Sequence, residues 1–446
     1  MKRRKKIVTT PFDSYRTPPK QNLFAMPILW LLCWILTRKG RLKIHRERME
    51  GLKPPFLVLG THLSFTDFYV TPLALFPHRA NYVSELEGFE AFGEWVYRQA
   101  GCLGTRKFIP DVPLVRNIKR VIDRKGILVL YPEARYANVG TSSELTASVS
   151  KLAKLLKVPV VVLNMRGNYL QSPIWNLAIR RQARLDATIT QVFTAEELEK
   201  APLEEVGAKL QAAMTFDEYA WQYETALAIT YEKRAEGLDA VLYQCPACKS
   251  AFQMAAEGAE LFCKCCGARW RMTEYGKMEH IAGVLPADTQ VGTALSHIPD
   301  WYEWERTQVE AEIDAGQYAL CARVHIEALP NAVNFIDLGE GLLKHDETGF
   351  SLTFTPYGEQ REQTRLFPPD TMSSVHTEYN YRNKGQCITL STPDNTYFLF
   401  PRETGFNVTK IQFAAEYFHG RAKRRRALNR GGKCIRPGAA RRDVSL

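Results

Sequence analysis

The chain has 446 residues, of which 45% are hydrophobic and 24% charged; this excludes a wholly disordered protein and leaves room for two to four domains. Its formal net charge of +11 sits at the ends: residues 1–50 carry +10 and residues 421–446 carry +9, so the middle is acidic, at about −8. Basic ends favour polyanions, either an anionic membrane leaflet or nucleic acid, and solvated tails would have the same composition.

The first 44 residues predict two segments. Residues 1–22, with five consecutive cations from Lys2 to Lys6 and a Pro18-Pro19 pair, predict a basic flexible arm. Residues 23–44 predict an interfacial helix, because an apolar run of 14 residues from Leu23 contains tryptophans and is followed by cations. This run is shorter than the roughly 20 residues that span a bilayer. A helix buried against the domain is the alternative. No small-residue cleavage site is evident, so we expect no signal peptide.

A strand-to-helix turn follows at residues 60–67. Residues 56–59 (FLVL) predict a short buried strand, and residues 68–70 predict the start of a helix. His62 and Asp67 lie in the turn between them. In α/β proteins such turns carry chemistry, and a histidine held by a carboxylate can take a proton from a hydroxyl. The alternative is an ordinary loop in which Asp67 only caps the helix.

The following segments predict an α/β domain over residues 45–237. Apolar runs at 127–131 and 158–163 are continuous, as in parallel strands that are covered on both faces. Helical spacing marks residues 84–100, residues 114–124 and the stretch after Thr141, where the sequence TSSE fits a capping box. Residues 203–237 predict a helical connector. We therefore expect a central, mostly parallel sheet with flanking helices.

Four short blocks of this domain resemble the glycerolipid (lysophosphatidic acid) acyltransferase family. His62 and Asp67 match its first motif, H-x4-D. Residues 101–107 resemble the second block, a glycine followed by a basic residue. Residues 131–135 (YPEAR) resemble the third, F-P-E-G-T-R, and residues 158–162 (VPVVV) are similar to the fourth, V-P-x-x-P. The resemblance covers residues 45–230, about 40% of the chain.

The resemblance implies roles for the first two blocks. His62 would be the general base on an acceptor hydroxyl, which attacks an acyl thioester, and Asp67 would orient the imidazole and stabilise its charged form. Arg106 or Lys107 would hold the acceptor phosphate, with Arg106 preferred because its guanidinium can bind in a bidentate way. The co-substrate would be acyl-CoA or acyl carrier protein.

The third block departs from the family. Glu133 matches the family glutamate and would bind polar groups of the acceptor. Ala134, Arg135 and Tyr136 stand where the family has Gly, Thr and Arg, so the cation has moved by one position. The fourth block lacks its second proline. Because a shift of one residue re-aims a side chain, phosphate binding by Arg135 stays open, and the acceptor need not be lysophosphatidic acid.

The cysteines predict a metal site. Five of the ten lie within residues 245–266, which indicates metal binding in a reducing, cytoplasmic setting rather than disulfides. Cys245 with Cys248 and Cys263 with Cys266 are C-x2-C pairs separated by 14 residues. This spacing predicts a structural zinc in a ribbon over residues 240–275. Cys265 is the spare, and exchanging it for Cys263 gives poorer spacing.

Residues 280–420 predict a β-rich domain. Alternating runs at 320–326, 350–354, 387–390 and 397–400 are typical of strands, residues 301–315 and 408–419 are typical of helices, and residues 275–300 are loop-like. The pattern is similar to a pleckstrin-homology-like barrel. Residues 421–446 predict a basic disordered tail.

Two functions compete. The first is an O-acyltransferase, peripheral on the inner, cytoplasmic face of an anionic membrane, that acylates a lysophospholipid (1-acylglycerol-3-phosphate-like) hydroxyl. The second is a catalytically inactive, acyltransferase-like zinc-ribbon adaptor or nucleic-acid-binding protein. The sequence shows no face that is both aromatic and basic. Nucleic acid is therefore not the partner that we expect.

Overall fold

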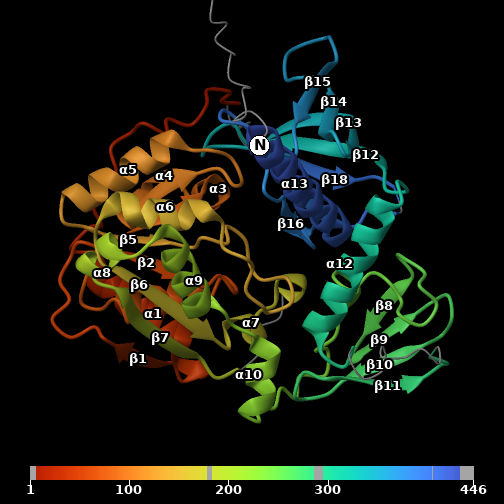
Figure 1. Ribbon diagram of the computed structural model, residues 1–446, viewed down its shortest axis with the longest axis horizontal. Helices are drawn as coiled ribbons and strands as arrows, with labels where there is room; N and C mark the ends of the chain where they lie inside the picture. The colour runs from red at the N-terminus through yellow and green to blue at the C-terminus, as the bar shows by residue number, and fades with distance from the viewer. Residues whose placement is uncertain (1–6, 178–182, 286–294, 404, 432–446) are drawn as a thin grey trace, which may run out of the picture.

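The computed structural model describes residues 7–177, 183–285, 295–403 and 405–431. Three bodies follow one another along the chain (Figure 1): an α/β domain at the left, a small four-stranded sheet at the lower right and a seven-stranded β-rich domain at the upper right. Within these ranges no helix is both long and apolar enough to cross a membrane.

The α/β domain is built on a seven-stranded sheet. Its strands are β1 (Lys43–Glu47), β2 (Phe56–Gly60), β3 (Ala80–Glu85), β4 (Cys102–Thr105), β5 (Ile127–Leu130), β6 (Val160–Arg166) and β7 (Asp186–Phe193). They lie in the order β1-β7-β6-β2-β5-β3-β4. Only the β6–β7 pair is antiparallel, so the sheet is mixed and mostly parallel, as expected.

Helices cover both faces of this sheet because its central strands are apolar on both sides. In β2, Phe56 and Val58 face one core, whereas Leu57 and Leu59 face the other. The first core contains side chains of α2 (Asp67–Ala74), against which α1 (Met26–Thr37) packs. The second core is completed by α5 (Val112–Asp123), α6 (Ala147–Leu156), α8 (Ala195–Lys200) and α9 (Leu203–Met214). The short helices are α3 (Leu86–Phe92), α4 (Glu94–Gln99), α7 (Asn168–Gln171) and α10 (Glu218–Glu224).

Several local predictions were wrong. The predicted helix over 84–100 is instead the end of β3 followed by α3 and α4, which break at Gly93, where φ is 90°. The predicted capping box at Thr141 caps nothing, because α6 begins only at Ala147 and Thr146 is its N-cap residue. Residues 102–105, predicted as part of an anion-binding loop, form β4 at the edge of the sheet.

The small sheet consists of β8 (Met254–Glu257), β9 (Glu260–Cys263), β10 (Arg269–Met272) and β11 (Met278–Ala282), and β11 lies in the stretch predicted as a loop. It is fixed to α12 (Ile298–Asp314). The rings of Trp270 and Trp301 meet edge to face at 4.9 Å, and the indole N–H of Trp301 donates to the Gln244 carbonyl at 3.2 Å. The ribbon therefore depends on α12 for part of its core.

The β-rich domain is a curled antiparallel sheet in the order β15-β14-β13-β12-β18-β17-β16. Its strands are β12 (Leu320–Ala328), β13 (Ile336–Asp346), β14 (Gly349–Phe354), β15 (Gln363–Phe367), β16 (His376–Glu378), β17 (Cys387–Ser391) and β18 (Thr396–Pro401). The closing helix α13 (Val408–Gly431) packs along α12 between this sheet and the α/β domain (Figure 1). The similarity to a pleckstrin-homology-like barrel stays a prediction.

The described part of each predicted basic end has a defined structure. Residues 7–22 do not form a free arm: the Phe12 amide donates to the Pro330 carbonyl at 2.9 Å. Arg124 donates hydrogen bonds to the carbonyls of Pro18 and Pro19. A proline-rich segment has no internal hydrogen bonds that could take their place. At the other end, α13 continues through residues predicted as tail. Residues 1–6 and 432–446 lie outside the described residues.

Candidate functional site

The turn between β2 and α2 brings the predicted pair together. His62 follows the C-terminal end of β2, and Asp67 is the first residue of α2. The imidazole Nδ1 lies 3.1 Å from Oδ2 of Asp67. Asp67 is 1% exposed, whereas the His62 side chain is 19% exposed, so the carboxylate lies behind the ring and the ring faces the open side.

The Asp67 carboxylate is held by more than the histidine. Oδ2 accepts the backbone N–H groups of Leu63 at 2.6 Å and Ser64 at 3.1 Å. Oδ1 accepts from the Asn168 side-chain amide at 2.7 Å. These bonds fix the carboxylate, which in turn favours the tautomer with its proton on His62 Nδ1 and leaves Nε2 free to accept one. Sequence reasoning missed Asn168; the signal was its place directly after β6 and Gly167.

Aromatic rings fix the imidazole plane. Tyr131 stacks on His62 with a centroid distance of 4.6 Å and an interplanar angle of 21°, and Tyr136 lies at 4.4 Å. Gly60 makes the first contact possible, because a Cβ there would lie 2.7 Å from the Tyr131 ring. The Tyr131 hydroxyl also bonds to Thr71 of α2, at 2.7 Å. The histidine therefore has little freedom to rotate.

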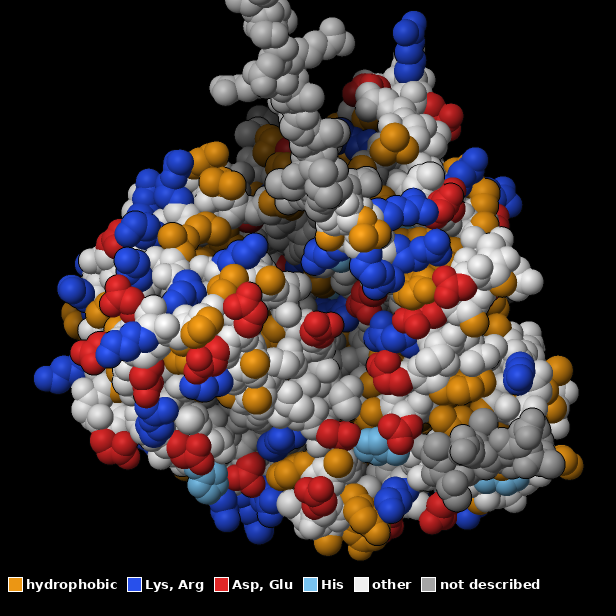
Figure 2. Space-filling view, viewed as in Figure 1, with side chains coloured by type: hydrophobic (Ala, Val, Ile, Leu, Met, Phe, Trp, Pro, Cys, Tyr) orange, Lys and Arg blue, Asp and Glu red, His pale blue; other side chains and the backbone are white. Residues whose placement is uncertain are grey.

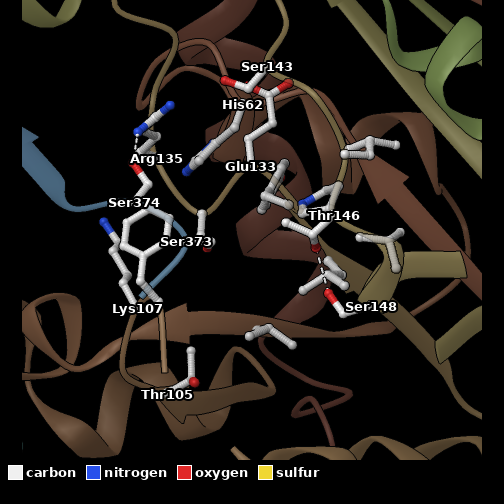
Figure 3. Close-up of a pocket in the computed structure, with 18 of the residues that line it drawn as sticks. His62, Thr105, Lys107, Glu133, Arg135, Ser143, Thr146, Ser148, Ser373 and Ser374 are labelled. Carbon is white, nitrogen blue, oxygen red and sulfur yellow. Dashed lines mark hydrogen bonds between the residues drawn. The ribbon is translucent and has the colours of Figure 1, made fainter. Parts of the chain in front are cut away.

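His62 opens onto a cavity of about 2300 Å³ between the α/β domain and the β-rich domain. The hollow is visible at the centre of Figure 2. Figure 3 shows His62, Glu133, Arg135 and Lys107 around it, with Ser374 approaching from the β-rich domain. Apolar side chains of α5 and α6 line another part of the wall. The cavity can therefore take an apolar chain and a polar group at once.

Glu133 is buried beside this cavity. Neither carboxylate oxygen has a hydrogen-bond partner of good geometry among the described residues. Burial raises the pKa of Glu133 to about 8, against the opposing effects of the Arg135 guanidinium and the Ser143 backbone N–H. Near neutral pH this side chain is therefore mostly an uncharged acid that can donate a hydrogen bond. The adjacent Ala134 has a φ of 56°, the left-handed conformation that glycine adopts most readily.

The raised pKa of Glu133 gives a stability prediction. A carboxyl whose pKa is raised by folding stabilises the fold while it is protonated, and this contribution is lost as the pH rises from its ordinary value of 4.5 through about 8. Glu133→Gln keeps the shape and removes the titration. We expect the melting temperature of the variant to rise relative to wild type between about pH 5 and pH 8 and to change little above that. A difference that does not change with pH would contradict the buried, unpaired carboxyl.

Arg106, Lys107 and Arg135 are the candidate phosphate ligands, but each already has hydrogen-bond or ion-pair partners. Arg106 is buried, and its guanidinium donates to the backbone carbonyls of Pro330, Pro393 and Asp394, at 2.6 to 3.2 Å. With these bonds made, Arg106 ties the α/β domain to the β-rich domain instead of presenting a free cation to a phosphate.

The other two cations are also paired. Lys107 contacts Glu85, and its Nζ lies 3.1 Å from Nε2 of His376. Burial lowers the pKa of Lys107, but nearby carboxylates outweigh this effect and raise it. Arg135 donates to Ser374 at 2.5 Å and to Glu416 at 2.8 Å. Both side chains line the cavity with their charges already neutralised.

The four predicted cysteines form one cluster. The Sγ atoms of Cys245, Cys248, Cys263 and Cys266 all lie within 4.8 Å of one another. The Cys245–Cys266 and Cys248–Cys263 sulfur pairs are each 3.7 Å apart. A tetrahedron with metal–sulfur bonds of about 2.3 Å has edges of about 3.8 Å, so the cluster fits a tetrahedral metal. Cys265 is exposed and outside it.

Fold and site together define a class: an α/β domain with a histidine–carboxylate pair at the end of a central strand, followed by a four-cysteine ribbon and a β-rich domain. No family model and no curated protein sequence matches the chain. Among solved structures it is similar to the 1-acyl-sn-glycerophosphate (LPA) acyltransferase PlsC from Thermotoga maritima, at 16% identity and a TM-score of 0.35, over 44% of this chain and 82% of that chain. A similarity this weak supports no conclusion about function, so a function can be inferred only from the geometry of the site.

Proposed function

We propose that this chain is an O-acyltransferase that moves a fatty acyl group from a thioester, acyl-CoA or acyl carrier protein, to the hydroxyl of a lysophospholipid of the 1-acylglycerol-3-phosphate kind. The observation that carries the proposal is the His62–Asp67 pair, whose free Nε2 side opens onto the large cavity. The four sequence blocks support it. The second function, an inactive adaptor, loses support because the pair keeps a hydrogen-bonded geometry.

The geometry supports the following reaction. Nε2 of His62 takes the proton of the acceptor hydroxyl while its oxygen attacks the thioester carbonyl carbon. Asp67 stabilises the imidazolium that forms. The tetrahedral intermediate then collapses, the carbon–sulfur bond breaks, and the leaving sulfur takes the proton from Nε2. The products are the new ester and a free thiol, and the histidine is returned to its starting state.

The simplest test measures free thiol. The purified full chain is mixed with an acyl-CoA or with an acyl carrier protein thioester, and thiol release is followed with and without added lysophospholipid. We expect release to depend on the acceptor, with one new ester formed for each thiol. Release that ignores the acceptor would indicate a hydrolase, and no release from acyl-CoA or acyl carrier protein would contradict the proposal.

We further propose that α1 attaches the protein to the inner face of a membrane. One side of α1 packs on the domain through Met26 and Cys33, while large apolar residues on its other sides are exposed: Ile28, Leu31, Leu32, Trp34 and Ile35. Leu23 and Phe24, just before the helix, are also exposed. The cations of residues 38–43 follow directly. An exposed apolar helix next to cations suits the interface of an anionic bilayer.

Substitution of α1 tests this attachment. We expect Ile28→Ser/Leu31→Ser/Ile35→Ser to weaken co-sedimentation with phosphatidylglycerol vesicles at least tenfold, because three apolar side chains lose their transfer free energy of about 1.5–3 kcal/mol each. Leu366→Ser is the control, since Leu366 is at least as exposed as each of these three residues but belongs to the β-rich domain. Equal sedimentation of wild type and the α1 variant would contradict the attachment.

For the cysteine cluster we propose one structural zinc per chain. Four thiolates complete a tetrahedral shell and leave no position for a substrate, so the metal would hold the ribbon together rather than act in the reaction. Two tight turns with left-handed residues, Lys249 and Gly267, bring each C-x2-C pair around the site.

A further inference from the structure

The β-rich domain is fixed to the catalytic face of the α/β domain by buried polar contacts. The side-chain amide of Asn138 donates to the Tyr302 hydroxyl at 2.9 Å and to Gln412 at 2.8 Å. Arg135 reaches Glu416 of α13, which also pairs with Arg306 of α12 at 2.6 Å. Breaking such buried pairs is costly. Helix α13 is therefore a constant part of the cavity wall.

One face of α13 lines the cavity. Residues 416, 417, 419, 420, 423 and 424 all face it, which is the spacing of one side of a helix. Glu416 at one end touches Arg135 in the site. Lys423 and Arg424 lie two turns further along, about 10 Å along the helix axis. Figure 2 shows Lys and Arg side chains gathered over α13 beside the hollow.

Most cations of the cavity wall are already committed. Of its eight described Lys and Arg side chains, Arg106 bonds to carbonyl groups, and four more pair with carboxylates: Lys107, Arg135, Arg306 and Arg382. In the described part of the chain the other three make neither an ion pair nor a hydrogen bond: Lys151 on α6, and Lys423 and Arg424 on α13. The adjacent Lys423 and Arg424 are thus a pair of cations available to an anionic group of a bound molecule.

The position of this pair selects among substrate groups. The phosphate of a lysophospholipid is only a few bonds from the hydroxyl that must reach His62, so it would lie close to the histidine. The phosphate of an acyl thioester is joined to its sulfur by the long, flexible pantetheine arm, so it would lie well away from the histidine. Cations two helical turns beyond the Glu416–Arg135 contact suit the second arrangement.

We propose that Lys423 and Arg424 form the binding site for the phosphate of the acyl donor's 4′-phosphopantetheine arm. This rests on the proposed function. The same arm occurs in coenzyme A and in acyl carrier protein, and the two cations would bind its phosphate in either. Helix α13 thereby supplies part of the donor site, in the same cavity that His62 lines.

Three donors test the proposal with the full-length protein: an acyl-CoA, the matching acyl carrier protein and the matching N-acetylcysteamine thioester, which has no phosphate. Lys423→Ala/Arg424→Ala should raise KM for a phosphate-bearing donor by about tenfold, because charge-assisted hydrogen bonds are lost, with kcat unchanged. KM for the neutral thioester should not change. The matched control is Arg425→Ala/Arg426→Ala, which removes the same charge from the next two residues. These arginines pair with Glu347 and Asp370, outside the cavity.

The outcomes separate the possibilities. A KM effect on acyl-CoA alone, or on the carrier protein alone, supports the site and identifies its source. Three results would overturn the phosphate site without contradicting acyl transfer. They are an unchanged KM for both phosphate-bearing donors, an equal change in KM for the neutral thioester, or a change in the KM of the acceptor alone. If wild type transfers from no donor, the proposed function fails. Calorimetric binding of coenzyme A and of the carrier protein then decides: weaker binding by the variant supports the phosphate site, and equal or absent binding refutes it.

Discussion

Replacing His62 with alanine is expected to lower kcat for acyl transfer by roughly 10²–10⁴-fold, the usual contribution of general acid–base catalysis. The histidine is the group placed to accept the hydroxyl proton and to return it to the leaving sulfur. Its side chain is partly exposed and carries no hydrogen bond except to Asp67 within the described residues. We therefore expect the fold to survive, with an unchanged circular dichroism spectrum and melting temperature within a few degrees of wild type.

The chain provides a matched control for this variant. His45 on β1 also faces a carboxylate, with Nε2 3.2 Å from Asp186 Oδ1, but it is exposed and does not line the cavity. We expect His45→Ala to leave kcat unchanged. Asp67→Asn should also lower kcat, because the amide no longer favours a proton on Nδ1. Similar losses in the His45 and His62 variants would show that His62 has no special role.

The second large effect is expected from the cysteine cluster. Cys245→Ser/Cys263→Ser should reduce bound zinc from one per chain to none, because one ligand of each pair is lost. Zinc binding by such ribbons is linked to folding, with apparent free energies of about 10–16 kcal/mol in small peptides. We expect the ribbon to unfold, Trp270 to leave Trp301, and the protein to become sensitive to proteases between residues 245 and 282.

Elemental analysis and limited proteolysis check this expectation. Cys265→Ser is the control, because Cys265 lies between two ligands in sequence yet outside the cluster. It should keep one zinc and the wild-type cleavage pattern. Wild-type protein without zinc, or zinc retained by the double variant, would contradict the proposed site.

Local sequence patterns predicted the parts of this molecule that depend on local physics. Continuous apolar runs indicated β2, β5 and β6, and their burial on both faces follows from the same composition. The C-x2-C pairs indicated the cysteine cluster. Spacing of His62 and Asp67 across one strand-to-helix turn was enough to expect them to meet. Strand β7 alternates between buried and half-buried residues, which is also a readable pattern, and was missed.

The predictions of free phosphate-binding cations failed because the partners of these cations are distant in sequence. Arg106 and its carbonyl partners are separated by 224 or more residues, and Arg135 and Glu416 by 281, so nothing local indicated that these cations were already used. Asn168, 101 residues from Asp67, is the same case. Ala134 shows a different limit: it adopts a left-handed conformation, with a φ of 56°, which an alanine does not predict.

Acyl transfer to a lysophospholipid by means of the His62–Asp67 pair is the reaction that we propose. The most direct measurement is mass spectrometry of the lipids formed when purified protein is given one isotope-labelled acyl thioester and a mixture of lysophospholipids. We predict a labelled phospholipid from wild type, one acyl chain heavier than its acceptor, and almost none from His62→Ala. No labelled phospholipid from wild type, or the same amount from both proteins, would contradict the claim.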